Sequence, residues 1–267
     1  MLLEFGEFTE YPACMAAEPL YATLHLLPGR GVGGTEAERL RSRLERVLPA
    51  LDGRYPGTLA ADWRIGGGRA VALLSPAAPG EEGRLAARAA EMLFELVLRA
   101  RPAPLAVGLG LGPLTSRLER DRVLAMTGPG FDRARRAAEE ARRGRRLLRA
   151  RGFGPADAAL GGAFSVLGAL VAGWTLRQTQ LVRGWLRDGA LDWTPEAGIV
   201  LRPPRRRREV AAAFDLAPST VTEALQAADA EPFRDGLLAA AWTLAAALRE
   251  GAGQPPLSAS SPSTSRS

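Results

Sequence analysis

The hydrophobic and polar positions of the first 155 residues follow two alternating patterns. Short apolar or alternating runs predict strands at residues 20–27, 58–65, 69–76 and 104–112, and a short strand with a turn at 123–131. Apolar positions three and four residues apart predict three helices: one from Thr35 to Pro49, where Thr35 and Glu38 have capping-box spacing, and two at 81–100 and 129–149. Helices interleaved with a small mixed sheet predict an α+β sandwich over residues 18–155.

After residue 155 the apolar positions keep the helical spacing, and we predict no strand there. Residues 158–176 carry no charge, and their number would permit a membrane span. Because Ala and Gly dominate this run rather than Leu, Ile, Val and Phe, we predict a core helix with close packing instead. A strongly apolar run at 233–248 predicts another buried helix, on the core or at a homodimer interface.

The two ends of the chain fit neither pattern. Residues 1–17 are poorly patterned, and Met15 is a second candidate start of translation. Residues 251–267 are rich in Gly, Pro and Ser and predict a disordered tail. Between these ends we predict an α+β domain at 18–155 and an all-α domain at 156–250.

Three alternating glycines, Gly108, Gly110 and Gly112, end an apolar run and raise the question of a phosphate-binding loop. Their spacing is G-x-G-x-G rather than the dinucleotide-binding G-x-G-x-x-G, and Pro113 follows at once. The chain has no lysine, which excludes a P-loop. We therefore interpret them as strand glycines that let a neighbouring backbone approach closely.

Residues 208–228, "REVAAAFDLAPSTVTEALQAA", have the spacing of a helix-turn-helix. Ala211 is the small residue expected where the two helices cross. Apolar residues stand at the inner positions before, within and after the turn: Val210, Phe214, Leu216, Val221, Ala224 and Leu225. Asp215 replaces the usual turn glycine, and aspartate tolerates the left-handed conformation better than most residues.

The outward positions of this segment carry side chains suited to DNA. Ser219, which with Pro218 is predicted to start the second helix, lies on an outer face with Thr220, Thr222, Glu223 and Gln226, residues that can contact base edges or phosphates. The run Arg205, Arg206, Arg207 and Arg208 stands at the start of the first helix, where cations oppose the helix dipole. Phosphate contact explains such a run. The alternatives are a helical pair that only packs or dimerises, and a solvated basic linker.

The glycine strand and the block "TGPGFDRAR" together resemble the SatD family. The residues that carry the resemblance are Gly108, Gly110, Gly112, Gly128, Pro129, Gly130, Phe131, Ala134 and Arg135. The segment "WTLRQTQLVRGWL" resembles the W-T-x-x-Q helix of that family, and residues 208–228 resemble its terminal helix pair. The resemblance covers residues 18–248. It implies a fold distantly similar to class III nucleotide cyclases, of ferredoxin-like build, in which these glycines, Pro129 and Arg135 are structural.

The chain departs from this family at its acidic positions. Family members carry acidic residues at the end of the first strand and in the hairpin, where cyclases hold magnesium ions. Here those stretches read "HLLPGR" and "GGGRAV", and only Asp52 and Asp62 stand nearby. Magnesium needs carboxylates as ligands, so we predict no metal, no cofactor and no catalytic residue. The single histidine, His25, is predicted to be structural.

The composition of the chain indicates an anionic partner and the cellular compartment. The 35 basic residues are all arginines and give a net charge of +6, which favours a nucleic acid as partner. Those in residues 129–149 are spaced for ion pairs along a solvated helix face, with a second anion patch as the alternative. One cysteine, Cys14, excludes an internal disulfide, and no signal peptide is visible, so we expect a cytoplasmic protein.

The sequence thus predicts a SatD-like, DNA-binding transcriptional regulator. Its α+β domain would be a non-catalytic, cyclase-like unit for dimerisation or for sensing a nucleotide or small-molecule effector. The alternative is a nucleotide-binding protein or enzyme of cyclase-like fold, with the helical region as an interaction module.

Overall fold

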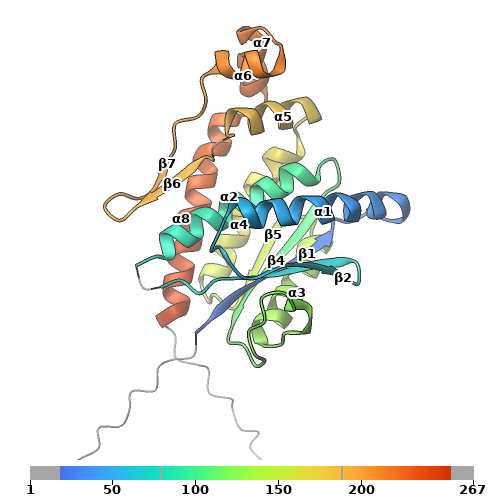
Figure 1. Ribbon diagram of the computed structural model, residues 1–267, viewed down its shortest axis with the longest axis vertical. Coiled ribbons are helices and arrows are strands. Elements are labelled where there is room, and N and C mark those ends of the chain that lie inside the picture. Colours follow the sequence, from blue (N-terminus) through green and yellow to red (C-terminus); the bar gives the residue numbers. More distant parts are fainter. Residues whose placement is uncertain (1–18, 79, 188, 254–267) are drawn as a thin grey trace, which may run out of the picture.

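The computed structural model of the protein describes residues 19–78, 80–187 and 189–253 (Figure 1). Its first part alternates strands and helices: β1 (Tyr21–Pro28), α1 (Gly34–Arg54), β2 (Leu59–Gly66), β3 (Arg69–Leu74), α2 (Glu82–Ala100), β4 (Leu105–Gly112), the 3₁₀ turn η1 (Val123–Ala125), α3 (Pro129–Arg143) and β5 (Leu148–Arg151). Its second part contains α4 (Ala156–Ala172), α5 (Leu176–Trp185), β6 (Leu191–Thr194), β7 (Gly198–Leu201), α6 (Arg207–Phe214), α7 (Pro218–Ala227) and α8 (Ala230–Gly253). The fold is mixed, as the predicted α+β class requires.

The described strands form one five-stranded sheet, in the order β2-β3-β1-β4-β5, and a separate two-stranded hairpin of β6 and β7. In the large sheet β1 lies antiparallel between β3 and β4, so that Thr23 pairs with Leu73 on one side and Gly110 on the other. β5 is parallel to β4, with Gly110 opposite Arg151. The sheet is therefore mixed, with its parallel pair at the β5 edge.

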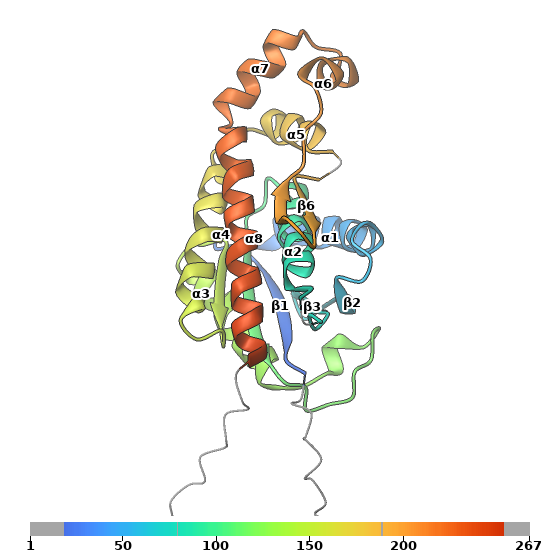
Figure 2. The same ribbon diagram turned by 90° about the vertical axis from the view of Figure 1, so that its left-hand side faces the viewer.

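The alternation of side chains along β1 and β4 gives the sheet two covered faces. Ala22, Leu24 and Leu26 of β1 join the main hydrophobic cluster, to which α1 and α2 contribute buried residues such as Leu48 and Leu93. α3 packs on β4 and β1 from the other face. Val71 and Leu73 of β3 belong to a second, smaller cluster with η1. Figure 2 shows α1 and α2 separated from α3 by the strands.

The helices of the second part extend the same core. α8 runs along the length of the molecule and packs on α2 and α4, while α4 also packs on β5 (Figure 2). Phe94 of α2 lies with its ring centroid 5.6 Å from Phe164 of α4 and 5.5 Å from Phe233 of α8. The predicted segments 18–155 and 156–250 therefore share one hydrophobic core. Residues 233–248 pack on that core, which is one of the two alternatives predicted for this helix.

Among the described residues, no single helix has both the length and the apolar character needed to cross a membrane. α4 and α5 meet these criteria only when joined, and they are bent by 120° at the break between them.

The predicted limits of the first helix are wrong at both ends. Its N-cap is Gly33, no side-chain cap is present, and Thr35 lies inside the first turn, so the capping box does not form. The helix continues through Pro49 to Arg54. Burial of Leu48 and Leu51 on either side of the proline explains why the missing N–H does not end it.

Three predictions of strand and helix also fail. Residues 123–125 form the 3₁₀ turn η1 instead of a strand. Val123 is buried in the small cluster with Val71 and Leu73, although it does not pair with a strand. The third helix ends at Arg143, and residues 148 and 149, predicted as its last residues, belong to β5. Two strands, β6 and β7, lie in the part predicted to have none.

The predictions for the ends lie mostly outside the described residues. Residues 1–17 and 254–267 are not described, and residues 251–253 of the predicted tail belong to α8.

Candidate nucleic-acid interface

α6 and α7 form two short helices joined by a three-residue turn at one end of the molecule (Figures 1 and 2). The turn begins at Asp215, which has the left-handed conformation with φ 52° and ψ 56°. The N–H of Leu216 then donates to the carbonyl oxygen of Ala211, at 3.0 Å, which closes the end of α6. The aspartate therefore has the backbone conformation that glycine usually has there.

The inner faces of the two helices contain the predicted apolar residues. Val210 and Ala211 of α6 and Val221 and Leu225 of α7 are buried. Phe214, Leu216 and Ala224 are half-buried and pack against the main cluster. The spacing of these residues in the sequence therefore predicted correctly which side of each helix faces inward.

The outer face of α7 is accessible. Ser219, Thr220, Glu223 and Gln226 are exposed. Thr222 is half-buried, and its hydroxyl donates to the carbonyl oxygen of Pro218 at 2.9 Å. This hydroxyl is therefore not available as a donor to another molecule while that hydrogen bond is made. The N-cap of α7 is Ala217 with Pro218 in the first turn, so Ser219 does not cap the helix as predicted.

The four arginines before and within α6 differ in their surroundings. Arg206, Arg207 and Arg208 are exposed. Arg205 is half-buried, its backbone N–H donates to the carbonyl oxygen of Trp185 at 3.0 Å, and its guanidinium lies 3.9 Å from Glu209. α7 itself has no basic residue, so the positive charge of this surface comes from the start of α6.

The glycines of the predicted family motif form a close contact between β4 and α3. A Cβ on Gly108 would lie 1.9 Å from the carbonyl oxygen of Ala134, and one on Gly112 would lie 2.6 Å from the amide nitrogen of Gly130. Gly128 has a φ of 154° and precedes Pro129, the first residue of α3. These glycines therefore allow two backbones to touch.

Arg135, the remaining residue of the predicted motif, lies on the outer surface of α3. Its guanidinium is 3.3 Å from Asp132 and 3.6 Å from Glu139, and all three side chains are exposed to a large degree. This pattern matches the predicted ion-paired helix face.

The acidic residues near the hairpin do not assemble a metal site. No group of three or more metal-ligating side chains occurs within residues 19–78, 80–187 and 189–253. Asp62 forms an ion pair with Arg120 at 3.0 Å. Burial, and then the nearby Asp62 carboxylate, raise the pKa of Asp52 to about 6.

His25 is buried, and because it alternates with Leu24 and Leu26, which face α1 and α2, it lies on the α3 side of β1. Its burial, followed by the charges of Arg69 and Arg135, lowers its pKa to about 4. The side chain is therefore neutral at neutral pH, and its structural role stays a prediction.

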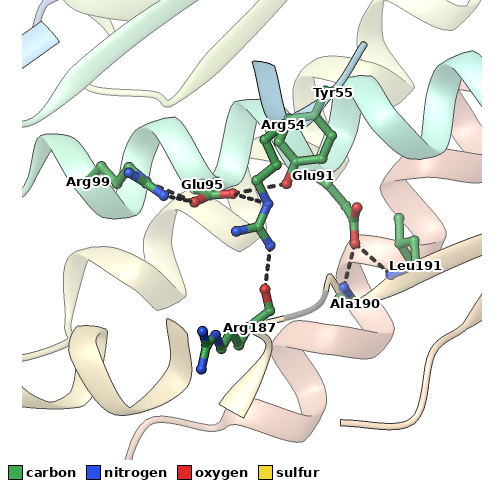
Figure 3. A network of polar contacts seen from close by, with 8 residues as sticks. All are labelled: Arg54, Tyr55, Glu91, Glu95, Arg99, Arg187, Ala190 and Leu191. Atoms are coloured by element: carbon green, nitrogen blue, oxygen red, sulfur yellow. Dashed lines mark hydrogen bonds and ion pairs between the residues drawn. The ribbon is translucent and has the colours of Figure 1, made fainter. Parts of the chain in front are cut away.

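A polar network between α1, α2 and the segment before β6 was not predicted from the sequence (Figure 3). Glu95 accepts hydrogen bonds from Tyr55, at 3.0 Å, and from Arg99, and it forms an ion pair with Arg54 at 3.0 Å. Glu91 accepts the backbone N–H groups of Ala190 and Leu191, the second at 2.7 Å. Burial raises the pKa of Glu91 despite these hydrogen bonds. Only the i, i+4 spacing of Glu91, Glu95 and Arg99 was visible in the sequence.

The scan against protein-family models found none that matches the chain, and the search of curated proteins found no match either.

Proposed function

We propose that the chain is a DNA-binding transcriptional regulator of SatD-like type that contacts duplex DNA through α6 and α7. The observation that supports this best is the exposed pair of helices at one end of the molecule, with a buried apolar inner face and a left-handed turn at Asp215. In a helix-turn-helix, the second helix enters the major groove and its first residues contact bases. Ser219, Thr220, Glu223 and Gln226 would make those contacts.

Arg206, Arg207 and Arg208 would contact the phosphates. They are exposed and have no ion pair among the described residues, so binding would not have to break one. Because α7 has no basic residue, the electrostatic part of the affinity would depend on these three side chains.

The sheet would be a cyclase-like, ferredoxin-like unit without catalysis. Its first four strands and two helices follow the order β-α-β-β-α-β, which is that of ferredoxin-like folds. Among the described residues, no cluster of carboxylates could hold a metal there. The unit would serve in sensing a nucleotide or small molecule, or in forming a homodimer.

Fluorescence anisotropy with labelled duplex DNA, over a series of salt concentrations, tests this proposal. We expect salt-sensitive binding, with a log–log slope that falls by about one for each phosphate that an arginine no longer neutralises. Replacement of Arg206, Arg207 and Arg208 by alanine should therefore weaken binding and flatten this slope. The matched control replaces Arg142, Arg143 and Arg146, which are also exposed, and removes the same charge at the end of α3.

Two results would overturn the proposal. One is the absence of salt-sensitive binding to both random DNA and DNA from upstream of the gene. The other is an equal effect of the two triple variants, since net charge alone would then explain it. Unchanged affinity and slope in the α6 variant would favour a helical pair that serves as an interaction module.

The alternative, nucleotide binding, has one supporting observation. Arg133, Arg136 and Arg151 line a cleft of about 640 Å³ where the parallel strands β4 and β5 end and α3 begins. Ligands of open α/β sheets bind at such strand ends. A rise in the melting temperature with magnesium and a nucleoside triphosphate, lost in Arg136→Gln but kept in Arg142→Gln, would support this alternative, because Arg142 is exposed on the same helix and does not line this cleft.

A further inference from the structure

A second surface on the molecule gathers positive charge in a concave site. A cleft of about 420 Å³ lies between α1, the C-terminal end of α2 and α5. Its lining includes five arginines, and we name it the arginine cleft: Arg43, Arg46, Arg99, Arg101 and Arg183, with Val47, Leu98, Leu176, Thr179 and Gln180 between them. No carboxylate is among these lining residues.

Arg183 is the residue that an anion would stabilise most. Its side chain is half-buried, and among the described residues its guanidinium has no hydrogen-bond or ion-pair partner. Burial, followed by the nearby charge of Arg99, lowers the pKa of Arg183, and the attraction of the Glu95 carboxylate offsets only part of this shift. A partly desolvated cation without a partner is unfavourable, so an anion bound beside it would lower its free energy.

Two further arginines are held in place without being neutralised. Arg43 donates to the carbonyl oxygen of Ala100, at 2.9 Å, and also to that of Arg101. The guanidinium of Arg101 donates to the carbonyl oxygens of Val171 and Trp174. Backbone carbonyls fix these side chains but leave their full charge, which is the preorganisation that anion binding needs.

Within the described part of the chain, Glu95 is the one carboxylate paired with an arginine of the cleft, and it is already shared. Glu95 pairs with Arg99, but it also binds Arg54 and the hydroxyl of Tyr55 (Figure 3). The charge of the arginine cleft therefore remains strongly positive. Arginines clustered in this way repel one another until an anion binds between them.

We propose that the arginine cleft is a binding site for a small, multiply charged anion, such as an organic phosphate. Guanidinium groups bind phosphate through paired, charge-assisted hydrogen bonds. Val47, Leu98 and Leu176 offer apolar surface to the organic part of such a ligand. We assign the cleft to a small molecule rather than to a DNA backbone because it is concave and its guanidinium at position 183 is recessed.

Isothermal titration of the full chain with inorganic tripolyphosphate, at an ionic strength of about 0.15 M, tests this site. We expect saturable binding that Arg183→Gln weakens about tenfold or more, the effect expected from removing one charge-assisted hydrogen bond. Arg177→Gln removes the same charge from an exposed position on the same helix and should leave binding unchanged. The variant lacking Arg206, Arg207 and Arg208 should also retain binding, which separates this site from α6.

The melting temperature of Arg183→Gln without ligand provides a second measurement. Because Arg183 makes no polar contact within the described part of the chain, its replacement should leave the melting temperature unchanged or raise it. Loss of binding would then not be a loss of folding. The proposal fails if tripolyphosphate does not saturate at millimolar concentration, or if Arg177→Gln weakens binding equally. It also fails if only DNA affinity falls in Arg183→Gln, which would make the cleft part of the DNA interface.

Discussion

A Cβ atom on Gly110 of β4 would lie 2.3 Å from the backbone nitrogen of Ala134 of α3. Gly108 and Gly112 on the same side of the strand meet α3 in the same way, and the helix presents Gly130, Ala134 and Ala138 to them, one turn apart. The glycine run that resembled a phosphate loop is thus one side of a helix–strand contact at backbone distance.

Gly110→Ala should therefore destabilise the protein. The added methyl group meets backbone rather than a flexible side chain, so the helix has to move as a whole. We expect the free energy of unfolding to fall by about 1–3 kcal/mol or more, measured by chemical denaturation.

Gly162→Ala in α4 is the matched control. A Cβ there meets nothing within 4 Å, and alanine is favoured over glycine inside a helix. This variant should be as stable as the parent or more stable, by up to about 1 kcal/mol. Equal destabilisation in the two variants would show that α3 is not packed closely on β4.

Glu91 should hold the β6–β7 hairpin to α2. Its Oε1 atom accepts the N–H groups of both Ala190 and Leu191, so Glu91→Ala leaves two buried donors without an acceptor. We expect a decrease of about 1–3 kcal/mol in the free energy of unfolding. Glu91→Gln keeps an acceptor oxygen at that position and should lower the free energy of unfolding clearly less. Similar decreases in both variants would mean that the charge, rather than the hydrogen bonds, matters.

Replacement of Asp215 by glycine should increase the stability of the protein slightly. Its φ of 52° is in the left-handed region, which glycine adopts freely and branched residues adopt at a cost. We expect Asp215→Gly to raise the free energy of unfolding by less than about 1 kcal/mol, and Asp215→Val to lower it by about 1–2 kcal/mol. Because the side chain is not among those expected to touch DNA, Asp215→Gly should bind DNA as the parent does.

His25 and Asp52 should make opposite contributions to stability in mildly acidic solution. The pKa of His25 is lowered from 6.5 to about 4, so the unfolded chain binds that proton more readily and stability rises with pH in this interval. The pKa of Asp52 is raised from 3.8 to about 6, so the folded chain keeps that proton and stability falls as pH rises.

Asp52→Asn should therefore make stability rise more steeply between pH 4 and pH 6, and His25→Asn should flatten the rise. Chemical denaturation of both variants and the parent across this interval measures the slopes. Parallel profiles for parent and Asp52→Asn would show that the pKa of Asp52 is the same in the folded and unfolded chain.

Local patterns in the sequence were sufficient for the α6–α7 pair. The positions of Ala211, Asp215 and the apolar residues around them follow from the spacing of two helices joined by a short turn, although the inner side chains also contact α5, where Phe214 lies against Gly184. The same holds for the apolar face of α8. It also holds for the glycines of β4, whose alternation predicted a close approach of another backbone but not that this backbone is α3. Whether this surface binds DNA stays a prediction.

The tertiary structure alone decided the elements whose stability comes from distant partners. β5 reads "LRAR", which continues the helical pattern of α3, and it is a strand because it pairs with β4. β6 and β7 have four residues each and are held by Glu91 and by Trp193, which packs over Gly83 of α2. The arginine cleft likewise unites side chains of α1, α2 and α5. The sequence determined the features that depend on spacing over a few residues, such as the inner faces of helices. The pairing of β5 with β4 and the clustering of arginines in the arginine cleft depend on residues far apart in the chain, which no local pattern reveals.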